Sequence, residues 1–174
     1  NAIYLVVEGG LFGQISHQAI GVHRYEITIH TPGGHSWGNF GQRSAIHELG
    51  RLIAAIDKIQ LPLRPKTTYN VGVIEGGTSV NTIAQTAKLL LDLRSEDPHR
   101  LAILVTEVEK LVLLRQRQQD VTVEMKQIGN RPPGQISRDT PLVQQAATAL
   151  RFVGSAKVNF IASSTDANVP LSQG

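Results

Sequence analysis

The sequence predicts an α+β fold of the ferredoxin-like, split-βαβ type, in which one four-stranded antiparallel sheet carries two helices on one face. Two observations predict it. Between residues 25 and 128, four segments show the alternation of apolar residues that is typical of strands, and two show the spacing of apolar residues that is typical of helices. These segments also follow one another in the order strand, helix, strand, strand, helix, strand.

The first strand and the first helix lie on either side of a glycine-rich turn. Tyr25, Ile27 and Ile29 alternate with polar residues, as in a half-buried strand, and Pro32-Gly33-Gly34 then ends the strand. We expect a helix to begin after Ser44, which is a suitable N-cap. Its apolar residues recur at helical spacing, namely Ile46, Leu49, Leu52, Ile53 and Ile56.

Two further strands flank the pair Gly76-Gly77. Tyr69, Val71 and Val73 alternate before the glycine pair. After it, one strand face is formed by Ala87, Leu89, Leu91 and Leu93. Two amphipathic strands separated by glycines indicate neighbouring strands of one sheet.

The second helix begins at Asp97-Pro98, with aspartate as the cap and proline in the first turn. Its apolar stripe consists of Leu101, Leu104, Val105, Val108, Leu111 and Val112. Val121, Val123 and Met125 predict the fourth strand.

The flanking segments look like pieces of another domain. Residues 3–7 form a continuous apolar run ended by Glu8-Gly9-Gly10, which predicts a buried parallel strand. Residues 130–134 predict a linker, and Thr140-Pro141 begins a third helix that continues to Leu150. A strand at residues 158–161 and a polar loop at residues 163–168 follow. These segments do not complete a domain, so we expect the chain to be part of a longer protein.

Composition excludes several classes of protein. The chain has 174 residues, of which 41 % are hydrophobic and 18 % charged, so it can form a core and disorder is not indicated. The net charge is only +3 and the basic residues are scattered, which argues against a nucleic-acid-binding surface. There is no cysteine, and therefore no disulfide or cysteine-ligated zinc. No apolar run is long enough for a membrane span, and no signal peptide is visible.

The segment Gly34-His35-Ser36-Trp37-Gly38 matches the G-x-S-x-G pattern of a serine-hydrolase nucleophile elbow. That elbow follows a fully buried parallel strand and leads at once into a helix. Here the preceding strand is amphipathic and the predicted helix begins several residues later. The later histidines, His47 and His99, also do not follow an acid in a fitting C-terminal loop. A serine hydrolase therefore remains an alternative, and so does a plain glycine-rich turn with an exposed histidine.

Several motifs together resemble the M20 metallopeptidases, which include enzymes similar to carboxypeptidase G2, tripeptidases and aminoacylases. The segments that carry the resemblance, in chain order, are Glu8-Gly9-Gly10, residues 21–27, Gly33-Gly34-His35-Ser36, Ser44-Ala45-Ile46, residues 76–83, Leu91-Asp92-Leu93-Arg94-Ser95 and residues 164–168. They span nearly the whole chain at plausible spacing. One departure is Ala84, where the family usually has proline, so the loop that carries Asn81 is less rigid than expected.

The resemblance implies a domain division and a chemistry. Residues 20–130 would be the lid, or dimerisation, domain, for which the split-βαβ fold is the family's fold. Residues 1–19 and 131–174 would be pieces of an α/β catalytic domain. In the family, two zinc ions in that domain activate a water molecule and polarise the scissile carbonyl.

The resemblance also implies roles for individual residues. Glu8 matches a carboxylate zinc ligand, although an ordinary polar strand end would look the same. His35 matches the lid histidine that reaches the active site of a partner subunit, where an imidazole can stabilise an oxyanion. Asn81 could hold the substrate backbone or the oxyanion, or could simply be a turn residue. Arg94 could bind a substrate carboxylate, or could pair with Asp92 or Glu96.

Asp166 and Asn168 are expected to shape the active-site rim rather than to bind metal, and Trp37 to serve packing. We therefore expect a cytoplasmic homodimeric zinc hydrolase acting on amide bonds of small peptides or N-acyl amino acids, with the choice between aminopeptidase and carboxypeptidase left open. The chain alone is expected to be inactive, because it has no His-x-Asp, no adjacent Glu-Glu pair and no C-terminal histidine to complete the metal site. A non-catalytic dimerisation module is the second alternative.

Overall fold

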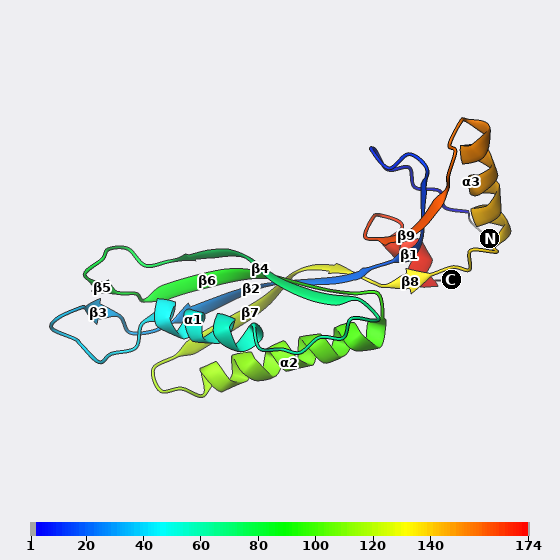
Figure 1. Cartoon of the computed structure of the whole chain (residues 1–174). Coiled ribbons are helices and arrows are strands. Elements are labelled where there is room, and N and C mark those ends of the chain that lie inside the picture. The colour runs from blue at the N-terminus through cyan, green and yellow to red at the C-terminus, as the bar shows by residue number, and fades with distance from the viewer. Residues whose placement is uncertain (1–2, 174) are drawn as a thin grey trace.

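The computed structural model describes residues 3–173, and Figure 1 shows two parts joined end to end. The larger part is a four-stranded sheet with helices α1 (Ala45–Ile56) and α2 (Pro98–Gln116) on one face. The smaller part lies at the end of this sheet where β2 (Gly21–His30) begins and β7 (Thr122–Arg131) ends. It contains a three-stranded sheet with helices α3 (Pro141–Phe152) and α4 (Asn168–Gln173).

The large sheet has the predicted split-βαβ topology. Its strands are β2 (Gly21–His30), β4 (Thr67–Gly76), β6 (Thr86–Ser95) and β7 (Thr122–Arg131). They lie in the order β4-β6-β2-β7, and every neighbouring pair is antiparallel. The two crossover helices are α1 (Ala45–Ile56) and α2 (Pro98–Gln116). The predicted fold class is confirmed.

The core lies between this sheet and the two helices. Its fully buried members come from β2, β6, α1 and α2, among them Ile27, Ile29, Leu49, Leu52, Leu89, Leu91, Leu93, Leu104 and Val108. The alternation of apolar residues along β6 explains this packing, because every second side chain of a strand points to the same face. The other face of the sheet carries charged residues such as Glu26 and Lys88.

The helix starts agree with the predictions in position but not always in detail. Asp97 caps α2, since its Oδ1 accepts a hydrogen bond of 2.8 Å from the backbone N–H of Arg100. Ser44 occupies the cap position of α1, but its side chain makes no cap hydrogen bond. The N–H of Ala45 instead donates to the carbonyl of Ala84, at 2.8 Å. The glycine-flanked loop before α1 is thereby tied to the segment between β5 and β6.

Edge strand β4 departs from simple alternation. Its pairing with β6 shifts between Val71 and Val73, as expected where a β-bulge adds one residue. Val71 packs against the core, whereas Val73 and Ile74 are 40 % and 58 % exposed. The prediction that Val73 shares the buried face of Tyr69 and Val71 was wrong, because the bulge changes the alternation.

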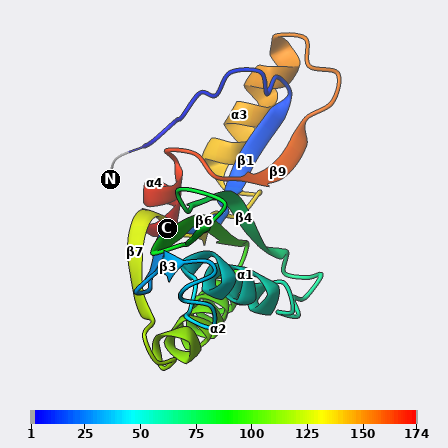
Figure 2. The ribbon, with the colours of Figure 1, turned by 90° about the vertical axis from the view of Figure 1, so that its left-hand side faces the viewer.

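The smaller part surrounds a strand that the sequence did not predict, β1 (Gln14–Ala19). It pairs parallel with β9 (Asn159–Ser163) and antiparallel with β8 (Gly134–Gln135). Helix α3 (Pro141–Phe152) and the short helix α4 (Asn168–Gln173) lie on this sheet, as Figure 2 shows. The predicted third helix and the strand near residues 158–161 are confirmed, with their ends moved by one or two residues.

Two predictions for the flanks were wrong. The predicted linker at residues 130–134 is mostly strand, because β7 runs to Arg131 and β8 begins at Gly134. Residues 3–8 form no strand, and Ile3, Leu5 and Val7 are 77 %, 71 % and 87 % exposed. A buried parallel strand needs neighbours on both sides, and here β1 occupies the place beside β9.

Candidate functional site

The histidine turn lies at the end of the sheet farthest from the smaller part. Strand β3 (Gly34–His35) pairs antiparallel with β5 (Thr82–Ile83), and Figure 1 shows this pair at the tip of the molecule. The N–H of Ser36 donates to the carbonyl of Asn81 at 2.9 Å, which extends the pairing by one residue. The structure therefore brings together two of the predicted site residues, His35 and Asn81.

Hydrogen bonds around His35 determine which of its ring nitrogens can serve a ligand. The backbone N–H groups of Trp37 and Gly38 both point at Nδ1, each at 3.3 Å. A backbone N–H is always a donor, so Nδ1 must accept, and the hydrogen of the neutral ring then lies on Nε2. The turn thus presents Nε2–H, a hydrogen-bond donor, on an exposed residue.

Asn39 and Gly34 fix the shape of this turn. Asn39 Oδ1 accepts from the N–H of His35 at 2.9 Å, and the N–H of Asn39 donates back to the carbonyl of His35 at 2.9 Å. Gly34 has a φ of +150°, and a Cβ there would lie 2.8 to 2.9 Å from the atoms of the Asn39 side chain. Glycine is required because any side chain would collide with Asn39.

Asn81 pairs with the histidine turn through its backbone carbonyl, and its side chain bonds to a neighbour in its own loop. Its Oδ1 accepts a 2.7 Å hydrogen bond from the hydroxyl of Ser79, which orients the side chain. With the oxygen engaged, the amide nitrogen is the end that can donate to a ligand. The predicted loss of rigidity at Ala84 is offset locally, because the carbonyl of Ala84 accepts from Ala45 N–H at 2.8 Å and from the hydroxyl of Thr31 at 2.9 Å.

Arg94 lies on β6 at the opposite end of the sheet from His35. Its Nε donates to Asp92 Oδ2 at 2.6 Å, and Arg24 Nε donates to Asp92 Oδ1 at 2.8 Å. Partial burial alone would raise the pKa of the Asp92 carboxyl, but the hydrogen bonds and charges of Arg94 and Arg24 outweigh it and hold the pKa below its usual value. Asp92 is thus a fixed anion that orients two guanidinium groups on the open face of the sheet.

The separation of these two ends limits what one chain can do. Strand β6 begins at Thr86, beside the β3–β5 end, and reaches Arg94 eight residues later. At roughly 3.3 Å per residue, this stretch is about 26 Å long. That is more than the two side chains can span, so His35 and Arg94 of one chain cannot contact the same small molecule.

Glu8 does not lie where the sequence predicted. It follows the exposed segment 3–7 rather than a buried strand, and it is itself exposed. Within residues 3–173, no group of three or more histidine, cysteine, aspartate or glutamate side chains could hold a metal ion. The described residues therefore do not form a zinc site, and Glu8 could contribute only one ligand to a site completed by other residues.

Ser36 lacks the surroundings of a hydrolase nucleophile. It follows a two-residue strand, and α1 begins nine residues later rather than immediately. Over residues 3–173, no hydrogen bond joins its hydroxyl to a histidine or carboxylate. This geometry does not fit the nucleophile elbow that the G-x-S-x-G pattern suggested.

Asp166 and Asn168 are near the junction of the two parts. Asn168 is buried, and its amide donates to the carbonyls of Ile20 and Pro132 at 2.8 and 3.0 Å. Asp166 Oδ1 lies 3.6 Å from Nη2 of Arg131, the last residue of β7. Asn168 therefore serves the structure, whereas Asp166 is exposed at the surface.

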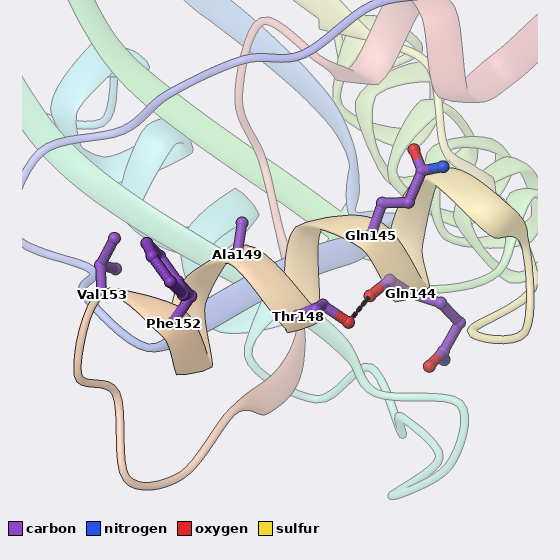
Figure 3. Close-up of a pocket in the computed structure, with 6 residues that line it drawn as sticks. All are labelled: Gln144, Gln145, Thr148, Ala149, Phe152 and Val153. Atoms are coloured by element: carbon purple, nitrogen blue, oxygen red, sulfur yellow. Dashed lines mark hydrogen bonds between the residues drawn. The ribbon is translucent and has the colours of Figure 1, made fainter.

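The described residues line a hollow along α3 and another beside the histidine loop. One, of about 520 Å³, lies along α3 and is lined by Gln144, Gln145, Thr148, Ala149, Phe152 and Val153 (Figure 3). Its walls come from one helix and its immediate end, and Phe152 is 91 % exposed. The other, of about 750 Å³, lies beneath the histidine loop and is lined by polar residues of the loop, α1 and the α2–β7 turn. Sequence reasoning missed the buried Glu48 in its wall.

The fold and the histidine tip define a split-βαβ module that is joined at one end to a smaller part built on a three-stranded sheet. The model of the peptidase dimerisation domain of the M20 family matches residues 19–119, which is more than half of the chain. The chain belongs to this family.

Individual relatives agree with this assignment. A probable carboxypeptidase of Arthroderma otae is 26 % identical over 144 residues, which cover 72 % of this chain and 31 % of the relative. The structure of a hydantoinase/carbamoylase-family amidase from Burkholderia vietnamiensis matches with a TM-score of 0.74 at 22 % identity, and the match covers 86 % of this chain and 36 % of the amidase. The structure of aminopeptidase PepT of Bacillus cereus matches with a TM-score of 0.72 at 22 % identity, and the match covers 93 % of this chain and 43 % of PepT. The chain thus spans less than half the length of these relatives.

No helix within residues 3–173 is long and apolar enough to cross a membrane.

Proposed function

We propose that this chain is the lid and dimerisation portion of a dizinc M20-type hydrolase that cleaves amide bonds of small peptides or N-acyl amino acids. In this proposal residues 20–130 are the lid, and residues 1–19 and 131–174 belong to the catalytic domain. The observation that carries the proposal is the fixed His35 ring, whose Nδ1 faces two backbone N–H groups while Nε2–H points outward.

His35 would act as an electrophile toward the substrate. Attack of water on an amide carbonyl places negative charge on the carbonyl oxygen, and a fixed N–H donor stabilises that charge. The Nε2–H of His35 would supply this hydrogen bond, and the side-chain amide of Asn81, whose backbone carbonyl pairs with the N–H of Ser36, would supply a second. Both donors are oriented before the substrate binds, so little free energy is spent on ordering them.

Arg94 would bind the free carboxylate of the substrate. Its Nε and Nη2 donate to the two carboxylate oxygens of Asp92, at 2.6 and 3.4 Å, so Nη1 is the nitrogen that is left to face a ligand. Asp92 would act as the positioning group that keeps Arg94 on the open face of the sheet. A carboxylate bound there would orient the amide bond relative to the catalytic domain.

Two zinc ions would supply a metal-activated water and polarise the carbonyl when bound. Glu8 is the one residue of this chain that we propose as a ligand, and the remaining ligands would come from other parts of the parent protein. We therefore expect the 174-residue chain itself to be inactive, and added zinc should not produce peptidase activity.

Dimerisation follows from the length of the sheet. Because His35 and Arg94 of one chain lie at opposite ends of β6, a substrate that contacts both needs two copies of the chain. We propose that the copies pair through edge strand β4 and helix α1. This edge exposes Val73, Ile74 and, from α1, Ile46 (40 %, 58 % and 44 %), whereas edge strand β7 exposes the charged Glu124 and Lys126, which discourage pairing.

The sharpest test mixes two inactive variants of the full-length parent. Glu8→Ala removes the proposed metal ligand, and His35→Ala removes the proposed donor. If His35 acts across the dimer, a mixed dimer has one intact centre, formed by Glu8 of one subunit and His35 of the other. Random mixing of equal amounts then restores about a quarter of the wild-type activity, since half of the dimers are mixed and each has one working site of two.

Three results would count against the proposal. Full activity of His35→Ala would remove the proposed role of His35. Inactive variants that do not complement each other, although mixed dimers form, would place His35 and Glu8 in the same subunit's centre. A Ser36→Ala variant that alone abolishes labelling by a fluorophosphonate would instead identify a serine hydrolase.

A further inference from the structure

A buried carboxylate beneath the histidine loop has three arginines around it. Glu48 of α1 has no exposed surface. Its Oε1 accepts hydrogen bonds from Arg43 Nη1 at 2.7 Å and from Arg51 Nη1 at 2.8 Å. Arg115 of α2 lies 3.6 Å from Oε2, which is an ion-pair contact rather than a hydrogen bond. The cluster therefore connects α1, α2 and the segment before α1.

We propose that Glu48 is a positioning residue, which holds the histidine loop, residues 36–44, in place through Arg43. This inference rests on the proposed function of His35, which lies at the first end of that loop. Arg43 lies at the other end, directly before the cap residue of α1. The β3–β5 pairing fixes the first end of the loop. At the second end, the backbone bond from Ala45 N–H to the Ala84 carbonyl holds the start of α1, and the Arg43–Glu48 ion pair is the side-chain contact that holds the loop itself.

Arg43 links the loop to both helices. Besides its bond to Glu48, its Nη2 donates to Gln118 Oε1 at 3.2 Å, just beyond the end of α2. Between the two fixed ends, the loop is held by its own turns, such as the bond from Gln42 N–H to the carbonyl of Asn39 at 3.1 Å. A shift of Arg43 would therefore be transmitted along a short, internally bonded segment to His35.

Apolar packing does not substitute for this ion pair. Trp37 and Phe40, the two aromatic residues of the loop, are 88 % and 92 % exposed. A polar hollow of about 750 Å³ lies between residues 40–44 of the loop and the helices, and its lining includes Phe40, Arg43 and Glu48. The loop stands over this hollow, so directional polar contacts have to set its position.

The burial of a charge at position 48 also fits a positioning role. Removing a carboxylate from water is costly, and an apolar side chain of similar size would fill the same site without that cost. An apolar side chain could not accept a hydrogen bond from Arg43. The property that glutamate adds at this position is therefore a fixed, directional contact with the loop.

Arg51 provides a matched control for Arg43. Both arginines donate to the same oxygen of Glu48 at nearly the same distance, but Arg51 lies three residues along α1 and does not belong to the loop. Loss of either removes one ion pair from Glu48. Only the loss of Arg43 releases the loop.

The test compares Arg43→Ala, Arg51→Ala and Glu48→Met in the 174-residue chain by NMR. Methionine is similar in size to glutamate but has no oxygen to accept a hydrogen bond from Arg43. We measure ¹⁵N relaxation of the amides of residues 36–42 and the ¹⁵N shifts of the His35 ring. Arg43→Ala and Glu48→Met should make the loop amides mobile and shift the ring from a single tautomer toward a mixture. Arg51→Ala should leave both measurements unchanged, even if it lowers the melting temperature.

A kinetic comparison in the full-length parent complements the NMR experiment. A displacement of about 1 Å can reduce a catalytic rate by up to about a hundredfold, so Arg43→Ala should lower kcat by about tenfold or more with little change in KM. Equal loop mobility in the two arginine variants would overturn the inference, and so would a rigid loop in Arg43→Ala. Activity that is independent of His35 would instead refute the proposed function, while the NMR comparison still decides the role of Glu48.

Discussion

Replacement of Gly34 by alanine should disrupt the turn that orients His35. The backbone at this position has a φ of +150°, which side chains rarely adopt, and the new Cβ would lie 2.8 Å from Asn39 Oδ1 and 2.9 Å from its Cβ and Cγ. Asn39 would have to move away, and its hydrogen bond to the N–H of His35 would be lost. Gly38, four residues later in the same loop, has no heavy atom within 4 Å of an added Cβ and is the matched control.

The expected magnitude has two parts. Holding a non-glycine residue in such a backbone region costs about 1–3 kcal/mol. Loss of the Asn39 hydrogen bond adds about 0.5–1.5 kcal/mol. The free energy of unfolding should therefore fall by roughly 1.5–4.5 kcal/mol if the turn is kept. Gly38→Ala should change it by less than about 0.5 kcal/mol.

Urea denaturation of the two variants measures the free energy of unfolding, and the ¹⁵N shifts of the His35 ring report the turn itself. If the turn rearranges locally to avoid the cost, the loss of stability will be smaller and the His35 ring will no longer show one tautomer. A Gly34→Ala variant that keeps both the wild-type stability and the single tautomer would refute the reasoning.

Three further predictions concern stability. Leu52→Ala should lower the free energy of unfolding by about 2–5 kcal/mol because Leu52 is fully buried. Ile46 lies on the same helix but its side chain is 44 % exposed, so Ile46→Ala should lower the free energy of unfolding much less. Urea denaturation of the two variants measures this difference. The pKa of Asp92 is lowered in the folded chain, so its contribution to stability is present above its unfolded pKa of about 3.9 and is lost as the pH falls through the folded pKa. Asp92→Asn should therefore reduce the dependence of stability on pH between the unfolded and the folded pKa. An acid unfolding transition that is the same in Asp92→Asn and in the wild type would contradict this prediction. Burial lowers the pKa of His23, so the folded chain should lose stability as the pH falls from the unfolded pKa of about 6.5 toward the lower folded pKa. In thermal melts between these two pKa values, His23→Gln should weaken the dependence of the melting temperature on pH.

The long periodic elements could be predicted from the sequence because their burial pattern is local. Along β6, the alternation from Ala87 to Leu93 reports directly which side faces the helices. The Asp97-Pro98 start of α2 was equally clear, since the cap hydrogen bond forms within four residues. Strand order then followed from the order of elements, since few topologies accept it.

The flanking elements could not be predicted because long-range pairing determines them. Strand β1 has a polar, weakly alternating sequence and is defined by its pairing with β9, about 145 residues away. Residues 3–7 have the more strand-like sequence, yet they find no neighbour in the described part of the chain. Burial of a continuous apolar run depends on partners that local sequence does not specify.

The site could be predicted only in part, because its details also depend on contacts that the local sequence does not specify. The glycines around His35 marked a special turn, but the tautomer depends on how the N–H groups of Trp37 and Gly38 point. The sequence does contain a signal for the buried ion pair of Glu48. Glu48 falls on the same helical face as Leu49 and Leu52, and a charged residue within an apolar stripe indicates a buried ion pair.

A twofold dimer through β4 would resolve the separation between His35 and Arg94. Identical edge strands that pair about a twofold axis run antiparallel. The Gly76 end of β4, near the His35 tip, would then lie beside the Thr67 end of β4 in the second copy. Because Thr68 of β4 pairs with Arg94, the His35 tip of one copy would approach the Arg94 end of the other.

Cysteine cross-linking tests this pairing directly, since the chain has no cysteine of its own. Single cysteines placed in turn at Asn70, Val71, Gly72, Val73 and Ile74 on β4 should give one or two positions that form a disulfide between copies under mild oxidation, because the Cα atoms must come within about 7 Å. Lys126→Cys on edge strand β7 is the control and should stay monomeric on a non-reducing gel. Cross-linking through β7, or through no position on β4 at a concentration where the chain is dimeric, would contradict β4 pairing, and with it the explanation of how His35 and Arg94 reach one substrate.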